Sequence, residues 1–118
     1  MKECAIYQSS HIIGKKWTIE IMLELYKGEK KEKRFNELKR KLGNITPTAL
    51  STSLGELEQE GLIEKRIDTT VLPGKSEYFL TECGEEFMQV IWELKKWSAK
   101  WKFKDMGCDE ALCRGCSM

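Results

Sequence analysis

Residues 34–63 read RFNELKRKLGNITPTALSTSLGELEQEGLI, and this segment carries the strongest fold signal in the chain. It predicts two short helices joined by a tight turn. The first helix covers residues 35–41, and the turn follows at Gly43-Asn44. Thr46 suits the N-cap of the second helix, and Pro47 suits its first position, where a missing N–H costs nothing. Gly61 then ends that helix.

The second helix has two different faces. Leu50, Leu54 and Leu57 recur at i, i+4 and i+7, so one face is expected to pack inward. The opposite face carries small hydroxyl side chains, which a helix built only for packing does not need. Hydroxyls hydrogen-bond to base edges, and threonine methyls contact thymine. The hydroxyl side chains are those of Thr48, Ser51 and Thr52. Taken alone, they fit an ordinary solvent-exposed face as well as a DNA-reading face.

Three further helices and one strand pair are predicted around this unit. Apolar residues four apart predict a helix over residues 16–27, and a short helix is predicted over residues 5–13. Residues 29–33 read as a charged loop. Strands over 62–70 and 77–80 flank a Pro-Gly turn at 72–76, with Ile63 and Ile67 expected to face inward. Thr81 caps a last helix over residues 82–103.

From residue 16 onward, the predicted order is helix, helix, helix, β-hairpin and helix, which is the order of a winged helix-turn-helix. The fold class is therefore α+β, mainly α, with terminal helices for dimerisation. We expect a winged-helix domain over residues 1–104 and a cysteine-rich tail over 105–118. The last helix carries more apolar surface than a monomer this small covers, which favours a homodimer. Its apolar stripe comprises Phe87, Val90, Ile91, Leu94, Trp97 and Trp101.

Charge and composition narrow the class of protein. The net charge is +1, but residues 27–41 hold eight basic and three acidic residues, enough for a phosphate-binding surface. No apolar run is long enough to span a bilayer, and no signal peptide is evident. We expect a cytoplasmic protein without a membrane partner. No catalytic triad, paired carboxylates or phosphate loop is present, so an enzyme is not expected.

Three segments resemble the HxlR-type transcriptional regulators, which are MarR-like DNA-binding proteins. They are IGKKW at 13–17, RFNELKRKLGNITPTALSTSLGELEQEGLIEKR at 34–66 and EYFLTECGEEF at 77–87. The resemblance covers about residues 4–101. It implies a homodimer on a near-palindromic operator in double-stranded DNA, with dimer contacts from the terminal helices. It also implies that Cys4 is a redox-sensing cysteine.

Three positions depart from the family pattern. Cys4 is followed by Ala5 where the family usually has proline. The loop between Gly28 and Arg34 is longer and more charged than usual. Gly55 stands where the family often has arginine, which removes a contact to phosphate or within the helix.

The winged-helix expectation assigns roles to individual residues. Groove contacts are expected from Thr48, Ser51 and Thr52, at the helix that Thr46 and Pro47 begin. The side chains expected at phosphates or the minor groove are Arg34, Lys65, Arg66 and Lys75, with Lys15 and Lys16 as weaker candidates. The recognition helix has no evident arginine or asparagine for bidentate base contacts. Sequence readout is therefore expected to depend on DNA shape.

The tail carries a second candidate site. Cys108, Cys113 and Cys116 form C-x4-C-x2-C, the spacing of three ligands of a plant-type [2Fe–2S] cluster. C-x2-C is also a zinc half-site. Cys4 is the best candidate for a fourth ligand, and Cys83 is expected to be a small buried residue. The interpretations rank as iron–sulfur cluster, then zinc, then a thiol switch without metal, with an unliganded tail as the remaining alternative.

Two other functions remain open at this point. The chain could be a small iron–sulfur or zinc protein that uses the winged helix only as a scaffold. It could also be a protein-binding module of a larger assembly. Salt-dependent binding to DNA separates both from a regulator, because neither needs an operator.

Overall fold

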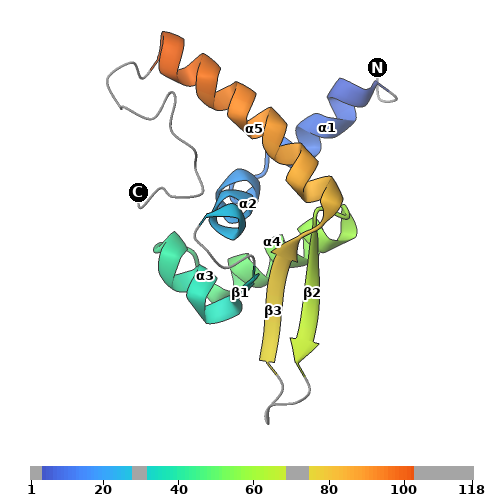
Figure 1. The fold of residues 1–118 in the computed structure, drawn as a ribbon, viewed down its shortest axis with the longest axis vertical. Coiled ribbons are helices and arrows are strands. Elements are labelled where there is room, and N and C mark those ends of the chain that lie inside the picture. Colours follow the sequence, from blue (N-terminus) through green and yellow to red (C-terminus); the bar gives the residue numbers. More distant parts are fainter. Residues whose placement is uncertain (1–3, 28–31, 69–74, 103–118) are drawn as a thin grey trace.

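The computed structural model of the chain describes residues 4–27, 32–68 and 75–102, except for the side chains of Asp68 and Lys75. Figure 1 shows helices gathered around one end of a small sheet. In chain order, the elements are α1 (Ala5–Ile13), α2 (Thr18–Tyr26), β1 (Glu32–Arg34), α3 (Phe35–Leu42), α4 (Pro47–Gln59), β2 (Ile63–Asp68), β3 (Lys75–Leu80) and α5 (Glu82–Trp101). This order confirms the predicted winged helix-turn-helix, with one strand added.

The added strand is β1, which replaces the end of the predicted charged loop. The sheet is antiparallel in the order β1-β3-β2, and Glu32 to Arg34 pair with Phe79 to Glu77. The loop prediction was wrong for residues 32 and 33, because a short run of charged residues shows no apolar alternation and becomes a strand only where β3 supplies a partner edge. Residues 29–31 of the predicted loop lie outside the described residues.

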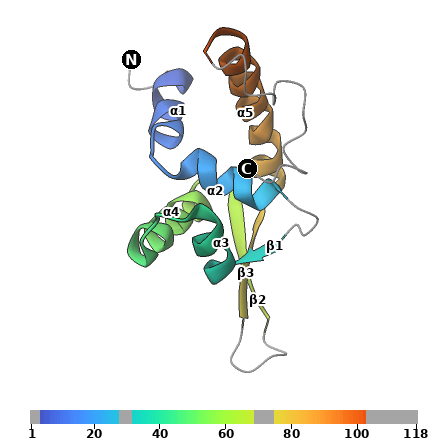
Figure 2. The same ribbon diagram turned by 90° about the vertical axis from the view of Figure 1, so that its left-hand side faces the viewer.

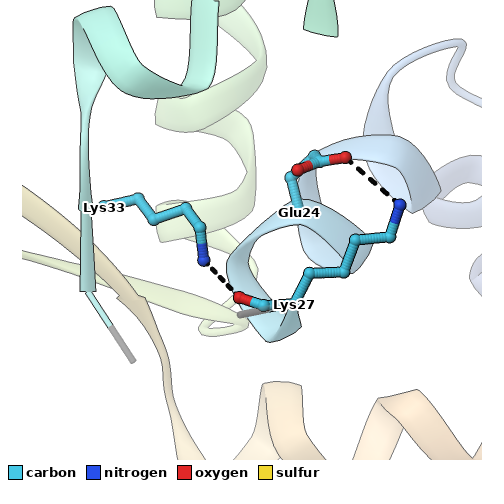
Figure 3. Close-up of polar contacts among 3 residues, drawn as sticks. All are labelled: Glu24, Lys27 and Lys33. Atoms are coloured by element: carbon cyan, nitrogen blue, oxygen red, sulfur yellow. Dashed lines mark hydrogen bonds and ion pairs between the residues drawn. The ribbon is translucent and has the colours of Figure 1, made fainter. Parts of the chain in front are cut away.

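A buried lysine ties β1 to the end of α2. Lys33 is only 5% exposed, and its Nζ donates a 2.5 Å hydrogen bond to the carbonyl oxygen of Lys27 (Figure 3). Lys27 Nζ in turn lies 3.4 Å from Glu24 Oε1. Carbonyls at a helix C-terminus lack partners within the helix, so a cation there is favourable. The lysine therefore fixes where the strand leading into α3 begins.

The core lies between the helices and one face of the sheet. The predicted stripes on α2 and α4 are buried, with Ile21, Met22 and Leu50 fully so. Tyr26 of α2 meets Trp92 of α5 edge to face, with ring centroids 4.8 Å apart. The other buried apolar residues are Leu25, Leu38, Ile45, Leu54, Leu57, Leu62, Ile63, Tyr78, Leu80, Met88 and Ile91.

The β2–β3 hairpin extends beyond this core as the wing. Ile63 is 1% exposed, but Ile67 is 57% exposed, so the expectation that both face the core was wrong for Ile67. Alternation predicts which side of a strand a residue occupies, but not where along the strand the core ends. Lys75 and Ser76 begin β3 and do not belong to the predicted turn. Residues 69–74 lie outside the described residues.

Helices α1 and α5 project from the end of the molecule opposite the wing in both ribbon views (Figures 1 and 2). No residue of α1 is buried, and Ile6 is 81% exposed. On α5, Ile91 is buried, whereas Val90, Leu94, Trp97 and Trp101 are exposed. We call these exposed residues, with Ile6, the apolar face of α1 and α5. The predicted domain boundary after residue 104 lies outside the described residues.

Candidate nucleic-acid interface

Helices α3 and α4 form a tight helix-turn-helix whose local chemistry matches the sequence prediction. Gly43 has φ +74°, a conformation that favours glycine, and it turns the chain out of α3. Ile45 is buried in the turn. Thr46 Oγ1 accepts a 3.1 Å hydrogen bond from the Ala49 N–H, and Pro47 follows at the first helical position. The predicted N-cap is therefore confirmed.

The two faces of α4 are separated as the sequence predicts. The leucine face is buried, whereas Thr48, Ser51 and Thr52 are all exposed. Thr46 and Pro47, at the start of the helix, are exposed as well. Gly55 continues this face one turn further, and a Cβ added there would meet nothing within 4 Å. The exposed face of α4 therefore has the small, hydrogen-bonding character that a groove-reading helix needs.

The basic residues predicted around the wing fall on opposite faces of the sheet. Antiparallel register aligns Arg34, Glu77 and Arg66 in one row across the three strands, on what we call the outer face. Lys65 lies on the inner face, in register with Tyr78, which is buried. Lys75 begins β3, and its side chain lies outside the described structure. The sheet therefore separates Lys65 from its neighbour Arg66.

The two outer-face arginines already have acidic partners. Arg66 forms an ion pair with Glu32, and Arg34 Nε lies 4.0 Å from Glu77 Oε1. A hydrogen bond between the two carboxyl groups, with Arg66 beside them, holds the pKa of Glu32 below its usual value. The same hydrogen bond raises the pKa of Glu77. These four residues act as one electrostatic unit.

Lys15 and Lys16 hold positions away from the wing. Lys15 forms an ion pair with Glu56 on α4, so its charge is partly neutralised. The Lys16 Nζ lies 5.0 Å from the centroid of the Trp17 ring. His11 is exposed and packs edge-on against Tyr7.

Two basic residues at the end of α3 were not singled out from the sequence. Arg40 and Lys41 are exposed and form no ion pair within the part of the chain that the structure describes. The first helix of a helix-turn-helix crosses the DNA backbone, so this end of α3 is suited to phosphate contacts. The sequence signal was the basic run over residues 27–41. The run does not show which of its basic residues form ion pairs within the protein and which remain exposed.

The two described cysteines are both exposed. Cys4 is the N-cap of α1, and its side chain forms no capping hydrogen bond. The backbone N–H groups of Tyr7, and then Ile6, lower the pKa of its thiol. Thiolates are favoured in this way at helix N-termini. The prediction that Cys83 is buried was wrong, because Gly84 faces the protein in the first turn of α5 and Cys83 faces outward.

Three of the four predicted metal ligands belong to the cysteine-rich tail. Cys108, Cys113 and Cys116 lie outside the described residues, and only Cys4 of the four predicted ligands is described. Across residues 4–27, 32–68 and 75–102, no group of three or more side chains is arranged to hold a metal ion. None of the helices described here is both long and apolar enough to cross a membrane.

Comparisons with known proteins agree with this geometry. Residues 12–106 match the HxlR-like helix-turn-helix family. The HTH-type transcriptional regulator YdeP of Bacillus subtilis is 37% identical over 99 residues, 84% of this chain and 74% of that protein. The reduced form of the transcriptional regulator YodB from B. subtilis aligns with a TM-score of 0.74 at 30% identity, covering 84% of this chain and 94% of YodB. YodB has also been solved with bound quinone. The oxidised redox regulator HypR aligns with a TM-score of 0.71 at 30% identity, covering 82% and 96%.

Proposed function

The chain belongs to the HxlR-like helix-turn-helix family of transcriptional regulators, and we propose that it is a homodimeric, thiol-responsive regulator of an operator in double-stranded DNA. Its relatives are DNA-binding regulators and not enzymes, as expected from the absence of a catalytic pattern. The observation that carries the proposal is the exposed face of α4. Thr48, Ser51 and Thr52 stand clear of the core on a helix whose opposite face is buried.

Dimerisation would pair two recognition helices on one duplex. The apolar face of α1 and α5 leaves large side chains such as Trp97 and Trp101 half exposed or more, on the end of the molecule away from the wing. Exposed apolar surface of this kind is typical of protein interfaces. A two-fold dimer would set the recognition helices about 34 Å apart, one turn of DNA, and would read a near-palindromic site.

Salt-dependent DNA binding is the test of this function. The operator is first enriched from random duplexes, and its affinity is then measured by fluorescence anisotropy from about 50 to 200 mM salt. A dimer with about six to ten phosphate contacts is expected to lose affinity by about 10³ or more over that range. A scrambled duplex of equal length is the control. Failure to enrich any sequence, together with salt-independent binding, would rule out a DNA-binding regulator.

Cys4 is the residue we propose as the sensor. Its thiol is exposed and its pKa is lowered at the start of α1, so it is a good nucleophile. The quinone-bound form of YodB and the oxidised form of HypR support thiol chemistry in related folds. Attack of the Cys4 thiolate on a quinone ring carbon would form a C–S bond. With one proton taken from water, the product is a hydroquinone thioether.

Alkylation of Cys4 is expected to persist at lower pH than for an ordinary thiol. Only the thiolate reacts, and a lowered pKa keeps more thiolate as the pH falls. Pulses of iodoacetamide at about pH 6 to 9, read by peptide mass spectrometry, would give the midpoint for Cys4. The urea-unfolded chain is the control, since it lacks α1. If the midpoint pH for Cys4 alkylation in the folded protein equalled or exceeded that in the unfolded chain, the result would contradict a sensing role based on the helix terminus.

The tail cysteines are the second candidate for the sensing group. Their spacing supports an iron–sulfur cluster first and zinc second, with Cys4 as a fourth ligand. Metal-bound thiolates resist alkylation. Iodoacetamide pulses on anaerobically purified protein would therefore show whether the tail thiols are bound to a metal. Protection of Cys108, Cys113 and Cys116 that a chelator removes would favour a metal-responsive regulator. Reactive tail thiols without a chelator would leave Cys4 as the sensor.

A further inference from the structure

The outer face of the sheet holds a row of alternating charges. Arg34 on β1, Glu77 on β3 and Arg66 on β2 are direct cross-strand partners. Glu32 lies on the same face as Arg34, two residues earlier on β1. Directly opposed charges of unlike sign stabilise antiparallel strands. The row therefore links all three strands on one side of the sheet.

Arg66 makes two side-chain contacts on this face of the sheet. Its guanidinium forms an ion pair with Glu32, which is 34 residues away in the sequence and two strands away in the sheet. The same guanidinium lies over Phe79, 5.2 Å from the ring centroid. The opposite pKa shifts of Glu32 and Glu77 agree with a closely coupled cluster. The guanidinium must leave its carboxylate partner before it can reach a phosphate.

Lys65 occupies the opposite face of the same strand. Lys65 follows Ile63 by two residues on β2, so the two side chains lie on the same face of the sheet. Ile63 is buried against the helices, and the Lys65 side chain therefore leaves the sheet on the side of the core. Figure 2 shows α3 and α4 together on one side of the wing. Lys65 is exposed, lies 6.0 Å from the Tyr78 ring centroid and forms no ion pair within the described residues. Its ammonium is available on the side where DNA would meet α4.

We propose that Lys65 is the DNA-contacting residue of this pair, and that Arg66 is a positioning residue that acts through Glu32. The Glu32–Arg66 pair spans β3 and joins the strand that leads into α3 to the strand that follows α4. It thereby sets the angle of the wing against the helix-turn-helix. This assignment rests on the proposed DNA-binding function. It gives the DNA contact of the wing to Lys65 and a structural role to the adjacent Arg66.

The decisive experiment is a charge reversal of the pair, measured by operator binding of the full chain. Arg66→Glu is expected to weaken binding about tenfold, since it opposes like charges across the sheet. Glu32→Arg combined with Arg66→Glu restores the pair with residue 32 but leaves the new glutamate opposite Glu77, so binding is expected to recover to within about threefold of the wild type. A glutamate at position 66 repels phosphate, so recovery means that residue 66 acts through residue 32.

The salt dependence of binding provides the second readout. Lys65→Met is expected to reduce the slope of log affinity against log salt by about one per protomer, and Arg66→Met is expected to leave it unchanged. Thermal unfolding confirms that each variant is folded. A double reversal as weak as Arg66→Glu alone, or a lower slope for Arg66→Met, would overturn the positioning role. Absence of salt-dependent binding by the wild type would overturn the proposed function and this role with it.

Discussion

Replacing Gly84 with alanine is expected to lower the free energy of unfolding by about 2–4 kcal/mol. Gly84 lies in the first turn of α5, and a Cβ at this position would stand 2.1 Å from the carbonyl oxygen of Leu62 and 3.2 Å from Leu80 Cδ2. A Cβ atom does not approach a carbonyl oxygen as closely as 2.1 Å, so the backbone of Gly84→Ala must move. The glycine allows α5 to approach the junction between α4 and β2 more closely than any side chain permits.

The neighbouring hydrogen bonds explain why the contact cannot relax cheaply. The Leu62 carbonyl accepts a 3.1 Å hydrogen bond from the Thr81 N–H, and the Gly61 carbonyl accepts one of 2.6 Å from Thr81 Oγ1. Thr81 also caps α5 by accepting from the Gly84 N–H. Moving α5 away from Leu62 therefore strains the cap and both of these bonds. The same movement would displace the helix that carries most of the proposed dimer surface.

Gly55→Ala is the matched control for Gly84→Ala. Gly55 is exposed in the middle of α4, and an added Cβ would meet nothing within 4 Å. Removing the flexibility of a helical glycine is expected to stabilise the protein by about 0.5–1 kcal/mol. Thermal and denaturant unfolding of both variants would show shifts of opposite sign. Equal midpoints for Gly84→Ala and the wild type would disprove the close approach at Leu62.

A negative charge on the exposed face of α4 is expected to abolish specific DNA binding. Ser51→Glu places a carboxylate on the face that the proposed function directs into the groove, between two phosphate backbones. Like-charge juxtaposition at an interface costs several kcal/mol, so affinity is expected to fall by about 100-fold or more. Fluorescence anisotropy with the enriched operator gives the measurement.

Folding is expected to be unaffected by this substitution. Glutamate has a better helix propensity than serine, and position 51 is exposed near the positive end of the helix. Gln89→Glu is the matched control, because it makes the same change in charge at an exposed site on α5. Wild-type affinity in Ser51→Glu, with Gln89→Glu also unchanged, would remove α4 from the binding surface.

Much of the helix-turn-helix could be predicted because its signals are local. The hydroxyl of Thr46, the fixed φ of Pro47 and the left-handed Gly61 each act within one turn of helix. The spacing of Leu50, Leu54 and Leu57 determines a buried face whatever that face packs against. The exposed hydroxyl face follows as its complement, so the candidate recognition residues were placed before any tertiary contact was known.

The errors arose where a residue depends on distant neighbours. Ile67 was expected in the core, but the wing continues past the helices that bury Ile63. Glu32 and Lys33 were expected in a loop, and with Arg34 they form a strand only because β3 offers a free edge. Cys83 was expected to be buried, but the closest contact of that turn belongs to Gly84. In each case the environment of the residue is set by segments distant in the chain, which the local pattern does not identify.

The order of the helices and the two faces of α4 could be predicted from the sequence, because capping, turn chemistry and helical periodicity act over a few residues. The family was recognised from the resemblance of three segments to the HxlR-type pattern. The pairing of Arg66 with Glu32 and the contact of Gly84 with Leu62 became known only from the tertiary structure. Those contacts join residues far apart in the chain through strand register and helix packing. Register and packing depend on the whole fold, since shifting a strand by one residue exchanges its two faces.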